Sequence, residues 1–322
     1  MPAFSVVVPA YNASSTLRET LDSVLAQELR DWELVVVDDG STDDTLAIAR
    51  EYASKDTRIR ALTQENRGSA GAYNAGVAAA TADFVTICSS DDLLLPDHLK
   101  AMSALIAANP GCDIFSCNGF FQREDGSRDV VWAKGAWLEE HSRSLEQVIG
   151  GCFFSVGATY RRSLFDLVGG YRDVYGEDYD FWLRVMARGA KHLYTPRTLS
   201  VHRLSAIQKS TDVCRVAESD IRSLTALAES GLLSDAELER VAKSVKRLER
   251  RIRELGRTPA DRAANEIGRQ NRSLHATMAR VLGQARADAA MAVARKVSRA
   301  VRPFRTAATR ATLAVVERLR RR

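Results

Sequence analysis

The chain has 322 residues, of which 45% are hydrophobic and 27% charged, which is typical of a folded α/β domain with a further segment. Its formal net charge of +5 is uneven: residues 1–242 hold 24 basic and 35 acidic side chains, and residues 243–322 hold 22 and 6. The five cysteines lack Cys-x-x-Cys spacing, and no apolar run reaches the roughly 20 residues of a membrane span, so a disulfide framework, a zinc site and a transmembrane protein are not expected.

Three short apolar segments near the N-terminus predict buried strands of a parallel sheet: residues 4–9, 32–39 and 83–88. No basic segment precedes the first strand, so we expect no signal peptide and a cytoplasmic protein. Small residues at 70–81 predict a helix before the third strand.

Two more helices are predicted between these strands. Leucines and a valine at helical spacing after residue 16 indicate the first, with Ser14 or Ser15 as its N-cap, and Thr42 or Asp43 can cap the second. The alternation of strands and helices predicts a doubly wound sheet, in which ligands bind outside the carboxyl ends of the strands.

Acidic pairs follow the second and third predicted strands. Asp38 and Asp39 precede Gly40 and a helix N-terminus, where a carboxylate can accept a hydrogen bond from a nucleobase or a ribose, or can only cap the helix. Asp91 and Asp92 are oxygen ligands of the kind that Mg²⁺ or Mn²⁺ uses together with substrate phosphates, although a solvated turn before Pro96 explains them equally well.

Two later features are ambiguous when taken alone. Glu177 and Asp178 begin a helix with an apolar face, where a carboxylate can take a proton from a hydroxyl group or can cap the helix. His202 follows a short strand-like run, and an isolated histidine is more often a surface residue than a ligand.

Long helices are predicted from about residue 212. Ser234 and Glu237 have the spacing of a capping box, and apolar residues at 3-4 spacing over 238–255 form a coiled-coil-like seam. The seam favours self-association or packing back on the first domain. The basic amphipathic end of the chain is typical of an element at an anionic membrane surface, with a solvated extension or an oligomerisation arm as alternatives. The near absence of aromatic residues there argues against nucleic-acid binding.

Several separated motifs together resemble the family 2 glycosyltransferases of the GT-A fold. They are VVVPAYNAS, WELVVVDDGSTDDT, ENRGSAGAYNAG, ADFVTICSSDDLLLP, GGYRDVYGEDYDFWLR and VHR, which lie between residue 4 and about residue 210. The resemblance implies a mixed, mainly parallel α/β sheet flanked by helices, with a catalytic domain at 1–210 and a helical, basic extension at 211–322.

The resemblance also implies an activity and a set of site residues. It implies transfer of a sugar from a nucleotide-diphosphate donor, most often a UDP-sugar, with inversion, to a glycan or lipid-linked acceptor, as in cell-envelope polysaccharide synthesis. The implied nucleotide-sugar contacts are Pro9, Ala10, Tyr11, Asn12, Asp38, Asp39, Asn66, Gly68, Asn74 and Asp91. The implied metal ligands for Mg²⁺ or Mn²⁺ are Asp91, Asp92 and His202, and Asp178 is the implied general base with Glu177 beside it.

Two positions depart from the family pattern. Ser89 stands where the family often has the first acid of its metal motif, and Tyr73 stands where it often has an arginine that can contact the diphosphate. Either change can weaken donor binding or alter metal dependence. A catalytically inactive nucleotide-sugar-binding or scaffold protein is therefore one alternative, and a nucleotidyltransferase, which would have no use for the Glu177–Asp178 helix, is another.

Overall fold

The computed structural model describes residues 1–131, 139–152, 154, 156–205 and 211–255. Contacts divide the chain into two compact units, Met1–Ile252 and Arg253–Arg322. The basic amphipathic end lies outside the described residues.

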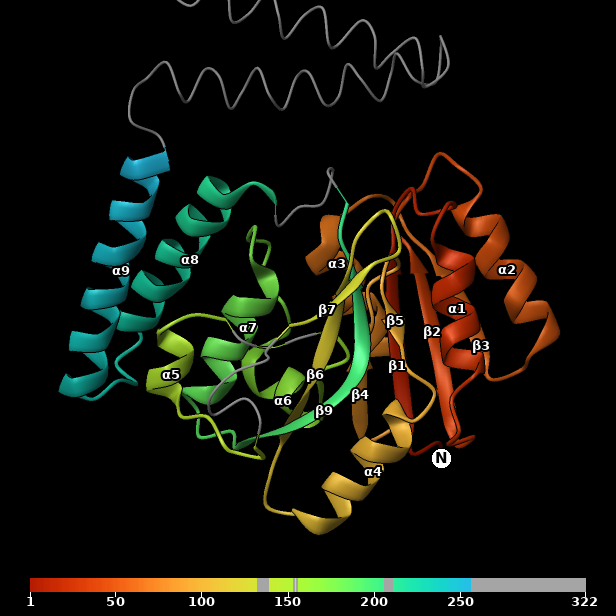
Figure 1. Ribbon diagram of the computed structural model, residues 1–322, viewed down its shortest axis with the longest axis horizontal. Coiled ribbons are helices and arrows are strands. Elements are labelled where there is room, and N and C mark those ends of the chain that lie inside the picture. Colours follow the sequence, from red (N-terminus) through yellow and green to blue (C-terminus); the bar gives the residue numbers. More distant parts are fainter. Residues whose placement is uncertain (132–138, 153, 155, 206–210, 256–322) are drawn as a thin grey trace, which may run out of the picture. The chain divides into compact units, whose positions relative to one another are not determined.

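The first half of the chain alternates strands and helices as predicted (Figure 1). Its elements are β1 (Phe4–Ala10), α1 (Leu17–Leu25), β2 (Trp32–Asp38), α2 (Thr45–Lys55), β3 (Ile59–Thr63), α3 (Gly68–Ala79), β4 (Phe84–Ile87), β5 (Leu93–Leu94) and α4 (His98–Ala108). The strand β3 was not predicted, because its sequence IRALT mixes polar and apolar residues and most of its side chains are only partly buried.

The second half contributes shorter elements and two longer helices. They are β6 (Ile114–Gln122), β7 (Arg128–Val130), α5 (Leu145–Ile149), β8 (Thr159–Arg161), α6 (Ser163–Val168), α7 (Glu177–Met186), β9 (His192–Arg203), α8 (Val213–Ala228) and α9 (Asp235–Leu255). None of the helices in the described ranges is long and apolar enough to cross a bilayer.

The described strands form one mixed sheet in the order β3-β2-β1-β4-β8-β6-β9-β5, with β7 paired to β6. The strands β3, β2, β1 and β4 are parallel, and β8 joins β4 and β6 antiparallel to both. The strand β9 runs parallel to β6 and antiparallel to β5. This pairing brings the end of β9 next to the segment that follows β4, although more than 100 residues separate them.

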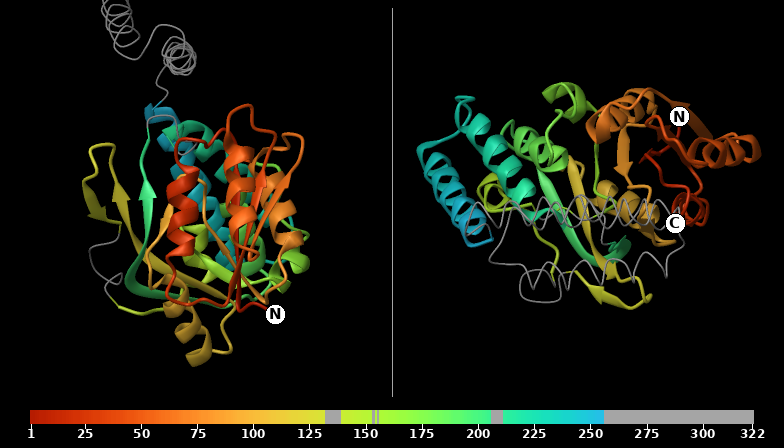
Figure 2. Two further views of the ribbon diagram at one scale, coloured as in Figure 1. Left: turned by 90° about the vertical axis from the view of Figure 1, so that its right-hand side faces the viewer. Right: turned by 90° about the horizontal axis from the view of Figure 1, so that it is seen from above.

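Both faces of the parallel part are covered, which explains its continuous apolar strands. Val7 and Val35 lie in one core cluster with residues of α3, and Val6 and Val8 lie in a second with residues of α1. The packing on α3 is tight, since a Cβ atom at Gly76 would lie 2.3 Å from the side chain of Val7. Figure 2 shows these helices on the sheet from two further directions.

The predicted caps of α1 and α2 were wrong. Thr16 is the N-cap residue of α1, and its hydroxyl donates to backbone carbonyl groups rather than capping the helix. Asp44 is the N-cap residue of α2, and the Asp43 carboxylate accepts instead from the backbone N–H groups of Ser14 and Thr45. These bonds connect the loops after β1 and β2, a contact that local sequence does not reveal.

The helices α8 and α9 lie side by side in both figures, and their apolar seam packs on the core that includes α7 (Figures 1 and 2). Val241 and Leu248 are buried there, and Ser234 and Glu237 form the predicted capping box. The described part of the seam therefore packs on the core that contains α7, within the unit Met1–Ile252. The contacts within the first unit continue through α8 and α9 to Ile252, so they do not divide the chain at residue 210. A functional boundary at residue 210 stays a prediction.

Candidate active site

A cavity of about 760 Å³ lies where β1, β2 and β4 end. Most of the predicted site residues line it, and they come from six separate segments of the chain. They are Pro9, Ala10, Tyr11, Asp39, Asn66, Gly68, Asp91, Asp92, Glu177, Asp178 and His202. The parallel sheet thus brings these side chains to one place, as expected for ligand sites at the carboxyl ends of strands.

Asn12 and Asp38 do not line this cavity and instead stabilise the loops beside it. The Asn12 amide oxygen accepts from the Thr42 backbone N–H at 2.9 Å, in a backbone conformation with φ of 49°. The buried Asp38 carboxylate accepts from Ser41 N at 3.2 Å and from Thr63 Oγ1 at 2.9 Å. Direct ligand contact by Asn12 and Asp38 remains a prediction. Their hydrogen bonds to other residues of the protein do not favour it.

Asn74 is also absent from the cavity lining. Its side chain makes two hydrogen bonds to the backbone of Tyr171: Nδ2 donates to the carbonyl at 2.9 Å, and Oδ1 accepts from the N–H at 2.8 Å. This pairing ties α3 to the loop that leads into α7. Asn74 therefore positions one wall of the cavity relative to another.

Asp39 is held with one oxygen available to a ligand. Its Oδ1 accepts from Gln64 Nε2 at 2.7 Å and from Arg67 N at 2.9 Å, and Oδ2 makes no hydrogen bond with the described residues. The next residue, Gly40, has φ of +73°, and a Cβ atom there would lie 2.8 Å from Asn66 N. Only glycine fits this turn, which brings the segment before α3 against Asp39.

Asp92 and His202 form a pair beneath the cavity surface. The Asp92 side chain is 1% exposed, and its Oδ1 accepts from Arg203 N at 3.0 Å and lies 3.1 Å from His202 Nδ1. Burial raises the pKa of Asp92 above its ordinary value, although the hydrogen bond and charge of His202 oppose this. Burial alone would lower the pKa of His202, but the hydrogen bond and charge of Asp92 outweigh it and raise that pKa.

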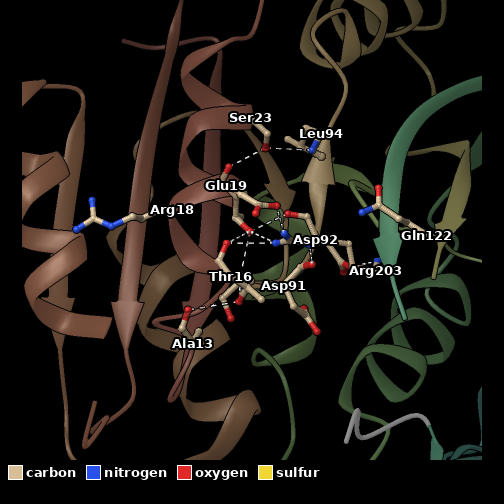
Figure 3. Close-up of polar contacts among 12 residues, drawn as sticks. Ala13, Thr16, Arg18, Glu19, Ser23, Asp91, Asp92, Leu94, Gln122 and Arg203 are labelled. Carbon is tan, nitrogen blue, oxygen red and sulfur yellow. Dashed lines mark hydrogen bonds and ion pairs between the residues drawn. The ribbon is translucent and has the colours of Figure 1, made fainter. Parts of the chain in front are cut away.

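Arg203 is a site residue that the sequence analysis missed. Its Nη2 donates to Thr16 O at 3.2 Å and to Thr20 Oγ1 at 3.1 Å, its Nε donates to the Asp91 carbonyl, and its Nη1 pairs with Glu19 (Figure 3). The guanidinium thus fastens the loop of Asp91 to α1. Its position directly after His202 could have indicated a site residue. The neighbouring sequence does not indicate that Arg203 contacts the Asp91 loop and α1.

Replacing Arg203 by Ala is expected to lower the free energy of unfolding by about 2–4 kcal/mol, because it removes several hydrogen bonds of a mostly buried cation. Arg18→Ala is the matched control, since Arg18 lies on α1, points away from Asp91 and Arg203 in Figure 3, and makes a half-exposed ion pair with Glu51. Its loss should cost less than about 1 kcal/mol. Urea unfolding measures both, and equal losses would contradict this role of Arg203.

The two departures from the family pattern lie at the cavity. Ser89 lines it, and its carbonyl accepts from Asp92 N at 3.0 Å in the turn after β4. Tyr73 also lines it and stacks on Tyr171, with ring centroids 4.9 Å apart. Burial raises the pKa of the Tyr73 hydroxyl well above its ordinary value, so this wall is neutral rather than cationic.

Asp178 projects into the cavity from the first turn of α7, which is firmly anchored. Its Oδ1 accepts from the Tyr179 N–H at 2.8 Å, and the Tyr179 hydroxyl donates to Val148 O at 2.9 Å. Further along α7, Asp180 and Arg184 form a buried ion pair at 2.6 Å. Asp178 is exposed and Glu177 is buried, so Asp178 is the better placed of the two to meet a substrate.

A smaller cavity of about 290 Å³ adjoins the first one. The two share the side chains of Tyr73, Ser89, Asp92, Asp178 and His202. Its remaining walls are largely apolar and include Phe154 and Trp182, whose rings stack with centroids 4.3 Å apart. Asp178 therefore lies where two binding spaces meet.

The carboxylates of Asp91 and Asp92 fit a metal ion whose other ligands come from a bound molecule. No group of three or more His, Cys, Asp or Glu side chains in the described ranges is arranged to hold a metal by itself. Asp91 and Asp92 instead supply oxygen atoms beside an open cavity, which suits Mg²⁺ or Mn²⁺ bound by one or two carboxylates and phosphate oxygens.

Solved structures identify the fold class. Staphylococcus aureus TarS (1–349), crystallised with UDP-GlcNAc, superimposes with a TM-score of 0.63 at 22% identity, over 80% of this chain and 74% of that one. The mannosyltransferase PcManGT from Pyrobaculum calidifontis, in complex with GDP-Man and Mn²⁺, gives 0.60 at 23% identity, over 99% and 87%. The fold is the GT-A fold of these glycosyltransferases.

The sequence gives the family. Residues 5–169 match the model of glycosyl transferase family 2, about half of the chain, and the chain belongs to that family. A curated relative, the putative glycosyltransferase EpsH of Bacillus subtilis, is 31% identical over 222 residues, which cover 65% of this chain and 63% of EpsH. The matched part of the chain thus spans less than two thirds of the length of EpsH, and the same holds for EpsJ, a second curated relative from that organism.

Proposed function

We propose that this protein transfers a sugar, of hexosyl type, from a nucleotide-diphosphate donor to a hydroxyl group of a glycan or lipid-linked acceptor, with inversion at the anomeric carbon. One observation carries the proposal: a single cavity joins Asp39, Asp91 and Asp178. These are a candidate base contact, a candidate metal ligand and a candidate general base. A UDP-sugar is the first donor to test, because TarS was crystallised with UDP-GlcNAc, and GDP-mannose is the second because PcManGT holds GDP-Man.

The proposed binding of the donor uses the strand ends. The free oxygen of Asp39 accepts an N–H of the base, and Pro9 to Tyr11 contact the base and ribose. Asp91 is the proposed direct ligand of Mg²⁺ or Mn²⁺, with Asp92 and His202 behind it. When bound, the ion stabilises the negative charge of the departing diphosphate.

The proposed chemistry at the acceptor falls to Asp178. Its carboxylate takes the proton of the acceptor hydroxyl, whose oxygen forms the new bond to the anomeric carbon. The bond from that carbon to the diphosphate breaks on the opposite face, and the diphosphate keeps the electron pair. The position of Asp178 at the junction of the two cavities supports this role, since donor sugar and acceptor must meet there.

Thermal unfolding with nucleotides tests the donor site. UDP, GDP or dTDP at about 100 times its dissociation constant should stabilise the folded protein by about 2.7 kcal/mol. We expect one of the three to raise the melting temperature more with Mn²⁺ than with EDTA. No shift with any of them would contradict the proposal. Binding without turnover of any nucleotide sugar would support the inactive binding protein, the second candidate that Ser89 raises.

The basic end of the chain bears on where the protein acts and how it assembles. We infer a cytoplasmic enzyme whose basic end, outside the described residues, attaches to an anionic inner membrane surface, because the charge of that segment suits such a surface. Homo-oligomerisation is the alternative use of the segment. Sedimentation of the full chain with vesicles containing phosphatidylglycerol, against vesicles of phosphatidylcholine alone, separates the two.

A further inference from the structure

A further carboxyl group reaches the active-site cavity from α8, outside the segment matched by the family model. Asp220 and Val216, one helical turn apart, line the cavity together with Asp178. The helix α8 packs on α7 (Figure 1). The buried Ser219 fixes their alignment, because its Oγ accepts from the Gly176 N–H at 3.1 Å.

The Asp220 carboxyl lies close to the start of α7. A Cβ atom built on Gly176, two residues before Asp178, would be 3.4 Å from Asp220 Oδ1. Asp220 makes no hydrogen bond and no ion pair with the described residues. A carboxyl group that is partly buried, unpaired and directed to a cavity costs folding stability, which is typical of functional groups rather than of structural ones.

The charges around Asp220 come from two helices. Burial and the Asp178 charge raise the pKa of Asp220 to about 7, while Arg247 and Arg251 of α9 partly oppose this. The negative charge of Asp220 contributes in turn to the raised pKa of Tyr179 and of Cys152. The charge of Asp178 therefore acts on the carboxyl group of Asp220 across the cavity.

We propose that Asp220 and Asp178 form a proton-sharing carboxyl pair, in which Asp220 receives the proton that Asp178 takes from the acceptor. This inference rests on the proposed transfer reaction. The acceptor O–H bond breaks, its proton goes to Asp178, and its electron pair forms the bond to the anomeric carbon. The proton then passes through cavity water to Asp220, which restores the Asp178 carboxylate. Asp220 acts through Asp178 and is a positioning residue.

Carbon-13 NMR of the aspartate carboxyl groups of the full chain tests the pair without any substrate. The Asp220 signal is the one that Asp220→Asn removes, and we expect its titration midpoint near pH 7. In Asp178→Asn that midpoint should fall by about one unit or more, because the neighbouring charge is gone. An ordinary acidic midpoint, or one that Asp178→Asn does not move, would overturn the proposal.

The pH dependence of UDP release from UDP-GlcNAc tests the consequence for turnover. In Asp220→Asn, or in Asp220→Ser if that variant folds better, we expect the inflection near pH 7 to disappear and kcat to fall about 3- to 10-fold at unchanged donor KM. Glu218→Gln, on the exposed side of α8, should keep the profile of the unaltered enzyme. An unchanged profile in the Asp220 variants would refute the pair. If the unaltered enzyme does not turn over UDP-GlcNAc, the donor assignment fails while the NMR titration still decides the pair.

Discussion

Asp178→Asn is expected to lower sugar transfer by about 10²- to 10⁴-fold and to leave donor affinity within about twofold, because general-base catalysis contributes rate factors of that size. Asparagine keeps the shape of the side chain, and its amide oxygen can still accept from the Tyr179 N–H. What it loses is the ability to take the acceptor proton. Asp178 lies at the junction of the two cavities, so the loss should affect kcat rather than binding.

The control for this substitution is Asp173→Asn, a nearby exposed aspartate that lines neither described cavity. It should retain full activity. Transfer rates and donor affinity, measured for both variants by product release and by calorimetry, give the comparison. Unchanged turnover in Asp178→Asn would reject Asp178 as the base, and a parallel loss of donor binding would show that it only shapes the pocket.

Asp91→Asn should have the second large effect, a loss of about 100-fold or more in the Mn²⁺-dependent affinity for the nucleoside diphosphate. A carboxylate ligand contributes charge to a shared metal site that an amide does not, and a divalent ion is worth several kcal/mol to a diphosphate leaving group. Because Ser89 supplies no carboxylate, we expect metal binding to depend more heavily on Asp91. Affinity in EDTA should be little changed.

Asp97→Asn is the matched control for Asp91→Asn. Asp97 lies six residues further along the chain and pairs with Arg197 at 2.5 Å on the surface, and it lines neither described cavity. Calorimetric titration of each variant with UDP, in Mn²⁺ and in EDTA, measures the effect. Equal metal enhancement in Asp91→Asn and in the unaltered protein would assign the ion to other ligands.

The parts of the fold that sequence predicted correctly are those that a local pattern specifies. The β-branched runs of β1 and β2 are buried on both faces, so their whole length is apolar and the strands are recognisable. Once three parallel strands were placed, the carboxyl-end rule brought Asp39, Asp91 and the end of β1 together. The Ser234–Glu237 capping box was equally local and equally readable.

Long-range contacts explain what sequence did not reveal. Arg203 acts on a loop and a helix more than 100 residues away, and Asn74 bonds to the backbone of Tyr171. No spacing rule connects such positions. Asp38 shows why an acid at a strand end is ambiguous in the sequence. It can contact a ligand, or it can hold the adjoining turn, as its bonds to Ser41 and Thr63 do.

The most direct test of the proposed function is nucleoside diphosphate release from UDP-, GDP- and dTDP-sugars, with Mn²⁺ and with EDTA in its place. The cavity that joins Asp39, Asp91 and Asp178 predicts metal-dependent release from one of these donors, which Asp178→Asn lowers by about 10²- to 10⁴-fold. Turnover that persists in EDTA and in Asp178→Asn, or no turnover of any donor, would contradict it.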